Sequence, residues 1–567
     1  MSVARLAPLA ALLACTVAEQ RPADRPYDAL LRGGWIVDGT GNPRYAGDLA
    51  ITGDRIAAVG RLPGAEARET LDVSGLVVAP GFIDMLGQSE TRVLIDNRVL
   101  SKVTQGITTE VTGEGGSIAP LTDALVAEDS AYLKRFGLDV DWRDLDGYFA
   151  RLQRSGPAVN VATFVGATQV RRVVIGDADR AATAAELARM AALVDTAMVQ
   201  GALGLSSSLI YAPAIYASTD ELVALARVAA ARGGVYATHM RNEGDRIDEA
   251  LNETFHIARE ADIPVEIWHL KVSGRANWGR MPHVLRRLDS ARAAGLDVTA
   301  DQYPYIASAT SLDAIIPAWA HDGGTDSLLA RLGRPDARRA IRDSMLRPAG
   351  RGENMYLGVG GADGILIASV FEDSLRYVQG KRLGEIARAR GRDPLETAFD
   401  LLLADHSHTG AIYFSMNEQD VRAALATWWV AVNTDYGAVA PDGPFADIRP
   451  HPRTYGAFTR ILGRYVRDAG LLPLEEAVRK MTSLAAQRVG LQERGVLRRG
   501  LFADVTVFDP RTVIDRATFE DPHQPSTGIA HVFVNGRAVL RDGALTDARP
   551  GRGLRGPGYI PPERRDR

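Results

Sequence analysis

Apolar positions in the middle of the chain follow two alternating patterns, which predict β-strands and α-helices in turn. Short, continuous apolar runs alternate with longer segments in which apolar residues recur at helical spacing. This alternation is typical of βα units in a parallel sheet. About eight such units fit between Gly81 and Ala485, so we predict an α/β protein with a (β/α)₈ barrel of the TIM type. The expected strands include Asn160–Val165, Gly234–Thr238, Pro264–His269 and Asp297–Tyr303, and the expected helices include Ala184–Gln200, Thr219–Ala231 and Ala276–Ala294.

The two ends of the chain show short alternating segments instead. Such segments span Tyr27–Val37, Gly47–Ile51 and Arg55–Val59 near the start, and Asp504–Phe508 and His531–Val534 near the end. Turn signals separate them, among them Gly53-Asp54 and Asn535-Gly536. We therefore predict one small β domain assembled from residues 27–80 and 486–548, with the barrel at 81–485 between them.

Two further segments stand apart from this pattern. Residues 306–409 are too many for one βα unit, and they predict an inserted lid or small subdomain within the barrel. Residues 549–567 are rich in Gly, Pro and Arg, and they predict an extended or disordered tail.

Composition narrows the class of function. The chain has 567 residues with a formal net charge of −4, which argues against a nucleic-acid-binding surface and is compatible with a small-molecule site. No run of about 18 apolar residues predicts a membrane-spanning helix.

The first 26 residues resemble a secretory leader followed by a short linker. One Arg precedes a brief apolar run, and Leu12-Leu13-Ala14-Cys15 resembles a bacterial lipoprotein cleavage box. We therefore expect an exported protein, in the bacterial periplasm or anchored to the outer membrane by lipid on Cys15. The alternative is an ordinary signal peptide with an incidental cysteine. Because Cys15 is the only cysteine, an internal disulfide and a thiolate-rich zinc site are excluded.

Two histidines are candidate metal ligands. Of the ten histidines in the chain, only His239 and His269 end strongly apolar predicted strands. In a βα barrel the active site lies at the carboxyl ends of the strands, where neutral imidazoles can bind Zn²⁺. Asp435 ends a later strand and adds a carboxylate to the same face. The alternative is two unrelated core histidines.

The chain also resembles a known family through a set of motifs that occur in order. It is similar to the N-acyl-D-amino-acid deacylase (D-aminoacylase) branch of the amidohydrolase superfamily from about Tyr27 to about Gly543. The resemblance implies a (β/α)₈ barrel with a β-sandwich domain made from both chain ends, and a metal-dependent hydrolase. The motifs are VVAPGFID, GITTEVTGEGG, GALGLSSSLIYAP, YATHMRNEGD, HLKVSG, DQYPY, HPRTYGAF, LEEAVRKMTSLAAQRVG, GVLRRGLFADVTVFDP and VNGRAVL.

The chain departs from the family at three metal-binding places. Leu86 and Gln88 stand where the family has a His-x-His pair after the first barrel strand. Gly115 stands at the position of a metal-binding Cys, and Ala167 at that of a further His. None of the five lysines ends an isolated strand, where a carbamylated lysine could bridge two metals. A two-metal site is therefore not expected.

The remaining groups imply a single zinc ion per chain. We predict that His239 and His269 bind it together with Glu114, whose Gly-rich loop lets its carboxylate turn inward. Glu114 could instead be an ordinary loop residue. Asp435 would act as acid and base, taking a proton from the water that zinc activates and passing it to the leaving amine. The alternative role for Asp435 is that of a turn residue or helix cap.

Three residues are predicted to bind the substrate. Lys271 and Arg241 lie two residues after His269 and His239, so each shares a strand face with a metal ligand. A cation there suits a substrate carboxylate, and Tyr303 could add a hydrogen bond. Lys271 could instead form a structural ion pair, and Arg241 could fix Glu243.

These residues favour a zinc-dependent hydrolase that cleaves the amide bond of an N-acyl amino acid or a dipeptide-like compound. The D configuration is implied only by the resemblance. Two alternatives stay open: a metal-free lipoprotein that binds a ligand or partner, and a hydrolase of a cyclic amide or lactone. The expected partner is a small molecule with a carboxylate. The sequence does not determine an oligomeric state.

Overall fold

Parallel β-strands form the centre of the protein. The computed structural model describes residues 26–565, so the leader and Cys15 lie outside the described residues. One parallel sheet has three strands and a second has six. The first holds β6 (Phe82–Asp84), β7 (Ile107–Thr112) and β8 (Asn160–Thr163); the second holds β9 (Val165–Gly166), β10 (Gly204–Ser208), β11 (Val235–His239), β12 (Val265–Ile267), β13 (Val298–Gln302) and β17 (Val430–Val432). Every residue of these strands is buried, as expected for parallel strands covered on both faces.

The two parallel sheets meet at both of their edges. Strand β8 continues into β9 across Phe164. At the other edge, the backbone amide of Met85, after β6, donates to the carbonyl oxygen of Val432, which ends β17, at 3.3 Å. The carboxyl ends of the first and last strands are thereby held side by side.

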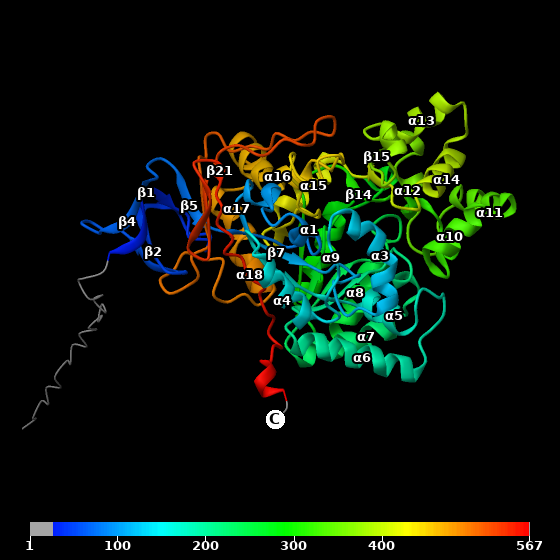
Figure 1. Cartoon of the computed structure of the whole chain (residues 1–567), viewed down its shortest axis with the longest axis horizontal. Coiled ribbons are helices and arrows are strands. Elements are labelled where there is room, and N and C mark those ends of the chain that lie inside the picture. Colours follow the sequence, from blue (N-terminus) through cyan, green and yellow to red (C-terminus); the bar gives the residue numbers. More distant parts are fainter. Residues whose placement is uncertain (1–25, 566–567) are drawn as a thin grey trace, which may run out of the picture.

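Helices follow nearly every central strand and lie around the sheets (Figure 1). Several begin at side-chain caps; Thr183, for example, forms a capping box with Glu186 at the start of α6. The helices are α1 (Arg92–Ile95), α2 (Leu100–Val103), α3 (Asp123–Arg135), α4 (Leu145–Ser155), α5 (Ala167–Val174), α6 (Ala184–Val199), α7 (Thr219–Ala231), α8 (Ile247–Ala261), α9 (Met281–Ala293), α15 (Glu418–Ala426), α16 (Arg453–Arg460), the π-helix Ile461–Asp468, α17 (Leu474–Met481) and α18 (Ser483–Arg488). No described helix is long and apolar enough to cross a membrane.

Strands from both ends of the chain share one nine-stranded sheet. Antiparallel pairing of β5 with β18 joins the two ends, with Val505 opposite Pro80. Asn535 and Gly536 form the predicted turn between β19 and β20, both at positive φ. Figure 1 places this sheet at one end of the molecule. Its strands are β1 (Tyr27–Ile36), β2 (Tyr45–Thr52), β3 (Arg55–Gly60), β4 (Ala67–Asp72), β5 (Val77–Pro80), β18 (Val505–Phe508), β19 (Ile529–Val534), β20 (Arg537–Arg541) and β21 (Ala544–Leu545).

The segment predicted as an insertion has its own hydrophobic core, which includes Leu328, Ile341, Phe399 and Tyr413. In Figure 1 its helices lie at the end of the molecule opposite the nine-stranded sheet. It contains a small antiparallel sheet in the order β14-β16-β15. Its elements are β14 (Ser308–Ser311), α10 (Gly324–Leu332), α11 (Pro335–Met345), α12 (Met355–Gly358), β15 (Ile365–Ser369), α13 (Leu383–Arg390), α14 (Pro394–Ala404) and β16 (Gly410–Tyr413).

Residues 549–565 pack against the central strands, so of the two forms predicted for the tail, extended or disordered, the disordered one is wrong. The amide of Leu554 donates to the carbonyl of Val161, and the amide of Val161 donates to the carbonyl of Arg552, both at 2.8 Å. The tail glycines permit this close approach: a Cβ on Gly556 would lie 2.2 Å from the carbonyl oxygen of Ala202. Glycine here serves contact rather than flexibility, which composition could not distinguish.

Candidate metal centre

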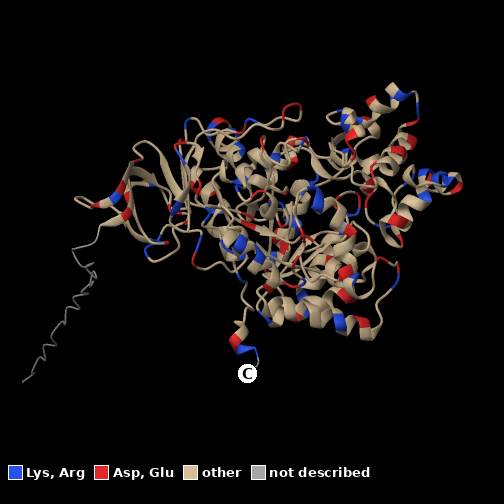
Figure 2. Cartoon of the chain, in the orientation of Figure 1, with Lys and Arg blue, Asp and Glu red and all other residues tan. Residues whose placement is uncertain are grey.

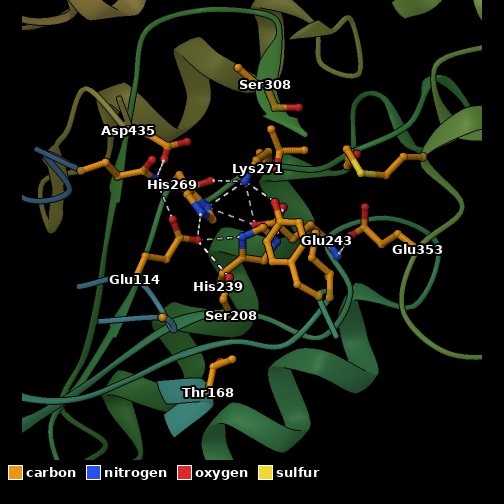
Figure 3. Close-up of a pocket in the computed structure, with 18 residues that line it drawn as sticks. Glu114, Thr168, Ser208, His239, Glu243, His269, Lys271, Ser308, Glu353 and Asp435 are labelled. Atoms are coloured by element: carbon orange, nitrogen blue, oxygen red, sulfur yellow. Dashed lines mark hydrogen bonds and ion pairs between the residues drawn. The ribbon is translucent and has the colours of Figure 1, made fainter. Parts of the chain in front are cut away.

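Three predicted ligands converge at the ends of three strands. Glu114 follows β7, His239 ends β11 and His269 follows β12. Glu114 Oε1 lies 3.1 Å from His239 Nδ1 and 3.2 Å from His269 Nε2. Among the described residues, these three form the one group whose potential ligand atoms all lie within 4.8 Å of one another. Figure 3 shows the three side chains pointing toward a common point.

The backbone around the centre adopts sparsely populated conformations. His269, Asp435 and Gln88 have φ of 39°, 47° and 50°, in the left-handed region that side chains other than glycine rarely adopt. The segments that follow β6 and β17 are hydrogen-bonded to each other here: the amide of Asp435 donates to the carbonyl of Leu86 at 2.9 Å. Strain of this kind persists where the surrounding structure enforces it, and it gathers at functional sites.

The donor set fits a divalent transition metal. Two imidazoles and one carboxylate are the ligands of known catalytic zinc sites. Burial would raise the pKa of Glu114, but hydrogen bonds and charges from His239 and His269 outweigh it and hold that pKa well below its usual range. The carboxylate is therefore anionic, as a ligand must be. Gly115 at φ 64° lets the loop pass Ser208, where a Cβ would come within 2.5 Å of that side chain.

Glu243 supports both histidines from behind and was not predicted as a site residue in its own right. Its Oε2 lies 3.3 Å from His239 Nε2, and its Oε1 lies 3.2 Å from His269 Nδ1. These are the ring nitrogens that do not face Glu114. A carboxylate that receives the outer N–H of a ligating histidine fixes its tautomer and ring orientation. The signal was available in the motif THMRNE, four residues after His239.

Lys271 lies at the site but is already engaged. Its ammonium lies 2.7 Å from Glu243 Oε2 and 2.7 Å from His269 Nδ1, and it donates to the carbonyl of His269 at 3.0 Å. The structural ion pair, which the sequence left open as the alternative, is the arrangement observed.

Asp435 lies beside the three ligands and is held by two side chains. Gln88 Nε2 donates to Asp435 Oδ1 and to Glu114 Oε2, each at 2.7 Å. Arg453 Nη1 lies 2.8 Å from Asp435 Oδ2. Burial raises the pKa of Asp435, and the charge of Arg453 opposes that rise. The Gln88 amide thus connects the carboxylates of Glu114 and Asp435, a role that sequence reasoning missed.

The structure places Arg241 and Tyr303 outside the cavity that contains the ligands. The Arg241 guanidinium binds Glu253 and the carbonyls of Ile215 and Ala217. Tyr303 is fully buried beneath the guanidinium of Arg453. Both predictions of substrate contact are therefore wrong in this geometry. Alternation fixes the strand face of a residue, but a long side chain beyond the strand end turns toward its strongest partner.

The cavity at the centre has a volume of about 240 Å³. The ligands line one part of it, and residues of the inserted segment, including Ser308, Glu353 and Met355, line another. The insertion therefore contributes directly to the walls of the site.

A second buried charge cluster lies next to this cavity. The Lys102 ammonium lies 2.8 Å from Asp84 Oδ2 and 2.8 Å from Glu110 Oε1, and all three side chains are fully buried. It also donates to Thr434 Oγ1 at 2.6 Å and to the carbonyl of Tyr436 at 2.7 Å. These are the residues on either side of Asp435. Lys102 therefore anchors the strained loop that presents the proposed acid/base group.

Candidate metal ligands at the carboxyl ends of parallel strands, in an α/β protein, form the kind of site expected of an amidohydrolase. The amidohydrolase family model matches residues 69–540, and the chain belongs to this family. The chain is 40% identical to a D-aminoacylase of Alcaligenes xylosoxydans xylosoxydans, covering 94% of this chain and 98% of that protein.

Solved structures agree with this assignment. A D-aminoacylase structure matches with a TM-score of 0.77 and 39% identity, covering 94% of this chain and all of that one. That enzyme has a binuclear metal centre, in which one metal activates and the second attenuates. The N-acyl-D-glutamate deacylase of Bordetella bronchiseptica, in complex with zinc and a phosphonate inhibitor, has a TM-score of 0.77 and 36% identity over the same shares. The resemblance to the N-acyl-D-amino-acid deacylases is confirmed, and with it an α/β amidohydrolase fold.

Proposed function

We propose that this protein is a zinc-dependent hydrolase that cleaves the amide bond of N-acyl-D-amino acids or dipeptide-like compounds. The observation that carries the proposal is the convergence of Glu114, His239 and His269 beside Asp435 in one cavity. The named activities of the relatives, D-aminoacylase and N-acyl-D-glutamate deacylase, support the D configuration and a substrate that carries a carboxylate.

We propose one zinc ion per chain, held by Glu114, His239 and His269. Leu86 is fully buried among apolar residues and Gln88 is committed to two carboxylates, so neither first-strand position offers a good second-metal ligand. When bound, zinc supplies polarisation of the scissile carbonyl and activation of the attacking water.

The chain's own residues supply proton transfer and orientation. Asp435 takes the proton of the attacking water and passes it to the amine nitrogen as the amide bond breaks. Gln88 and Arg453 hold its carboxylate in place. Glu243 lies against the outer ring nitrogens of His239 and His269, and the inner nitrogens of both rings face Glu114.

We infer that the two parallel sheets close into a single (β/α)₈ barrel. The hydrogen bond from Met85 to Val432 and the continuity of β8 with β9 support closure. We also infer that the nine-stranded sheet curls into the β-sandwich of the family. Its strands come from both chain ends, which supports this assignment.

The remaining proposals concern cellular location and partners. We propose export and lipid anchoring at Cys15, on the sequence pattern alone. Lys/Arg and Asp/Glu segments are interspersed throughout the view in Figure 2, which supports a small-molecule substrate rather than a large single-sign docking partner.

Metal analysis of the purified protein, paired with rates on N-acetyl-D- and N-acetyl-L-amino acids, tests the function. We expect one zinc per chain and faster hydrolysis of the D series. A protein that binds no zinc would favour the metal-free binding lipoprotein. A metal-loaded protein that cleaves only cyclic amides or lactones would favour the third alternative.

A further inference from the structure

The cavity of the metal centre adjoins two more cavities beneath the inserted segment. They have volumes of about 200 and 280 Å³. Ile210 and Tyr211 line both the central cavity and the smaller neighbour, and Glu353 lines all three. Glu353 therefore stands where a group extending from the metal centre would enter the neighbouring space.

The Glu353 carboxylate has one oxygen available. Oε1 accepts a hydrogen bond from the backbone amide of Glu243. Oε2 makes no hydrogen bond to a described residue, and it is not among the unpartnered polar atoms that are sealed from solvent. No described Lys, Arg or His side chain forms an ion pair with Glu353, whereas the neighbouring Glu243 is paired with Lys271. Burial raises the pKa of Glu353 to about 7, as expected for a carboxyl that lacks a cationic partner.

Two acidic and two basic side chains line the smaller neighbouring cavity. Asp313, Arg351, Glu353 and His321 line it. Arg351 is paired with Asp179 at 2.8 Å, and Asp313 accepts from the Ser407 hydroxyl at 3.0 Å. The two carboxylates therefore face the space without a free guanidinium or ammonium among the lining residues. A cationic or strongly donating group would be attracted there, and an acidic one repelled.

We propose that Glu353 selects substrates that carry a positively charged group distal to the scissile amide, and that it disfavours acidic side chains. The inference rests on the proposed deacylase function. The cation can come from the amino-acid side chain or from the acyl group, because both extend from the amide carbon and nitrogen held at the metal centre. This preference differs from that of the N-acyl-D-glutamate deacylase, which acts on an acidic amino acid.

The test compares kcat/KM of the zinc-loaded full chain on matched substrates. N-acetyl-D-lysine carries the charge on the side chain, and β-alanyl-D-methionine carries it on the acyl group. N-acetyl-D-methionine and N-propanoyl-D-methionine are neutral references, and N-acetyl-D-glutamate is the acidic one. We expect the parent to prefer at least one cationic substrate over its neutral reference, and the acidic substrate to be the poorest.

Glu353→Gln retains the oxygen that accepts from Glu243 and removes only the charge. We expect it to lower the cationic-to-neutral ratio of kcat/KM by at least about tenfold, the effect typical of losing a charged hydrogen bond. Asp326→Asn, on the exposed surface of α10, is the matched control and leaves the ratio unchanged. The cationic substrate affected identifies which end of the substrate reaches Glu353.

The outcomes distinguish failure of the Glu353 inference from failure of the proposed deacylase function. If N-acetyl-D-methionine is hydrolysed but the parent shows no cationic preference, or Glu353→Gln leaves the ratio within twofold, the inference is overturned and the deacylase stands. If the zinc-loaded parent hydrolyses none of the five substrates, the proposed function fails and the inference fails with it.

Discussion

Two buried charge clusters lie at the carboxyl ends of the central strands, and they differ in what occupies their centre. In one, the Lys102 ammonium stands between Asp84 and Glu110 and also contacts backbone and hydroxyl oxygens. In the other, Glu114, His239 and His269 face one another, and Lys271 lies on the outer side with Glu243.

The comparison shows two ways to stabilise buried carboxylates. One cluster contains the ammonium of a lysine, and the other leaves space where a metal cation could bind. Buried carboxylates are costly unless they are paired, and in the first cluster the Lys102 ammonium pairs with Asp84 and Glu110 from within the chain. The ligand cluster places one carboxylate and two imidazoles around a point that no lysine or arginine side chain occupies. Changes in the first cluster should therefore affect stability, and changes in the second should affect metal binding.

Removing a ligand should have the largest effect. We expect His239→Ala to lose stoichiometric zinc and hydrolytic activity, because the two remaining groups cannot complete a three-ligand site. Zinc content after dialysis and activity on N-acetyl-D-methionine measure this. The control is His283→Ala, a half-exposed histidine on α9 that we expect to keep both. Full zinc content in His239→Ala would contradict the proposed zinc site.

Removing the internal cation should destabilise the fold without removing a zinc ligand. Lys102→Met leaves Asp84 and Glu110 buried without their cation, which we expect to cost about 3–5 kcal/mol in free energy of unfolding. Denaturant unfolding of metal-free protein measures it, with the exposed Lys381→Met as the control. Adding Glu110→Gln should recover part of the loss. Parent-like stability in Lys102→Met would contradict the contrast between the two clusters.

Asp435 contacts both clusters, through its side chain and through its flanking residues. Asp435→Asn should keep zinc and lower kcat by at least about 10²-fold, because the amide cannot carry the proton. Single-turnover rates and zinc content on the same sample test this. An Asn variant as active as the parent would make Asp435 a purely structural residue.

Removing the support behind the ligands should have a smaller effect than removing a ligand. Glu243→Gln should weaken zinc affinity by about 10–100-fold, because the amide holds the outer ring nitrogens less firmly. Competition with a chromogenic chelator gives the affinity, and the visible spectrum of the cobalt-substituted protein reports ligand geometry. Unchanged affinity and spectrum would mean that Glu243 does not orient the histidines.

A substitution at the N-terminal Cys15 should have the smallest effect on either charge cluster. Cys15→Ser should release the protein from the membrane fraction while zinc content and stability stay at parent values. Mass spectrometry of the native protein should find lipid on a mature N-terminal Cys15. A mature N-terminus downstream of Cys15 would contradict the lipoprotein prediction.

The prediction of an α/β fold is confirmed, and the predicted ligands come together where strand ends were involved. His239 and His269 stand at the ends of short, continuous apolar runs, which are typical of parallel strands buried on both faces. Their position at the carboxyl edge of the sheet could therefore be predicted from the sequence pattern. Glu114 required the family comparison, because its loop carries no periodic signal. The prediction failed for Arg241 and Tyr303, whose partners, Glu253 and Arg453, lie 12 and 150 positions away in sequence.

By itself, the sequence determined the order of strands and helices, the contribution of both chain ends to one small domain, and the placement of His239 and His269 at strand ends. These depend on local periodicity and on strand ends, which are properties of short segments. Only the tertiary structure decided that Glu243 supports both histidines, that Lys102 rather than a metal compensates Asp84 and Glu110, and that the tail is packed. Each depends on which distant side chains share a buried space, where the cost of an unpaired charge or polar group selects the partners.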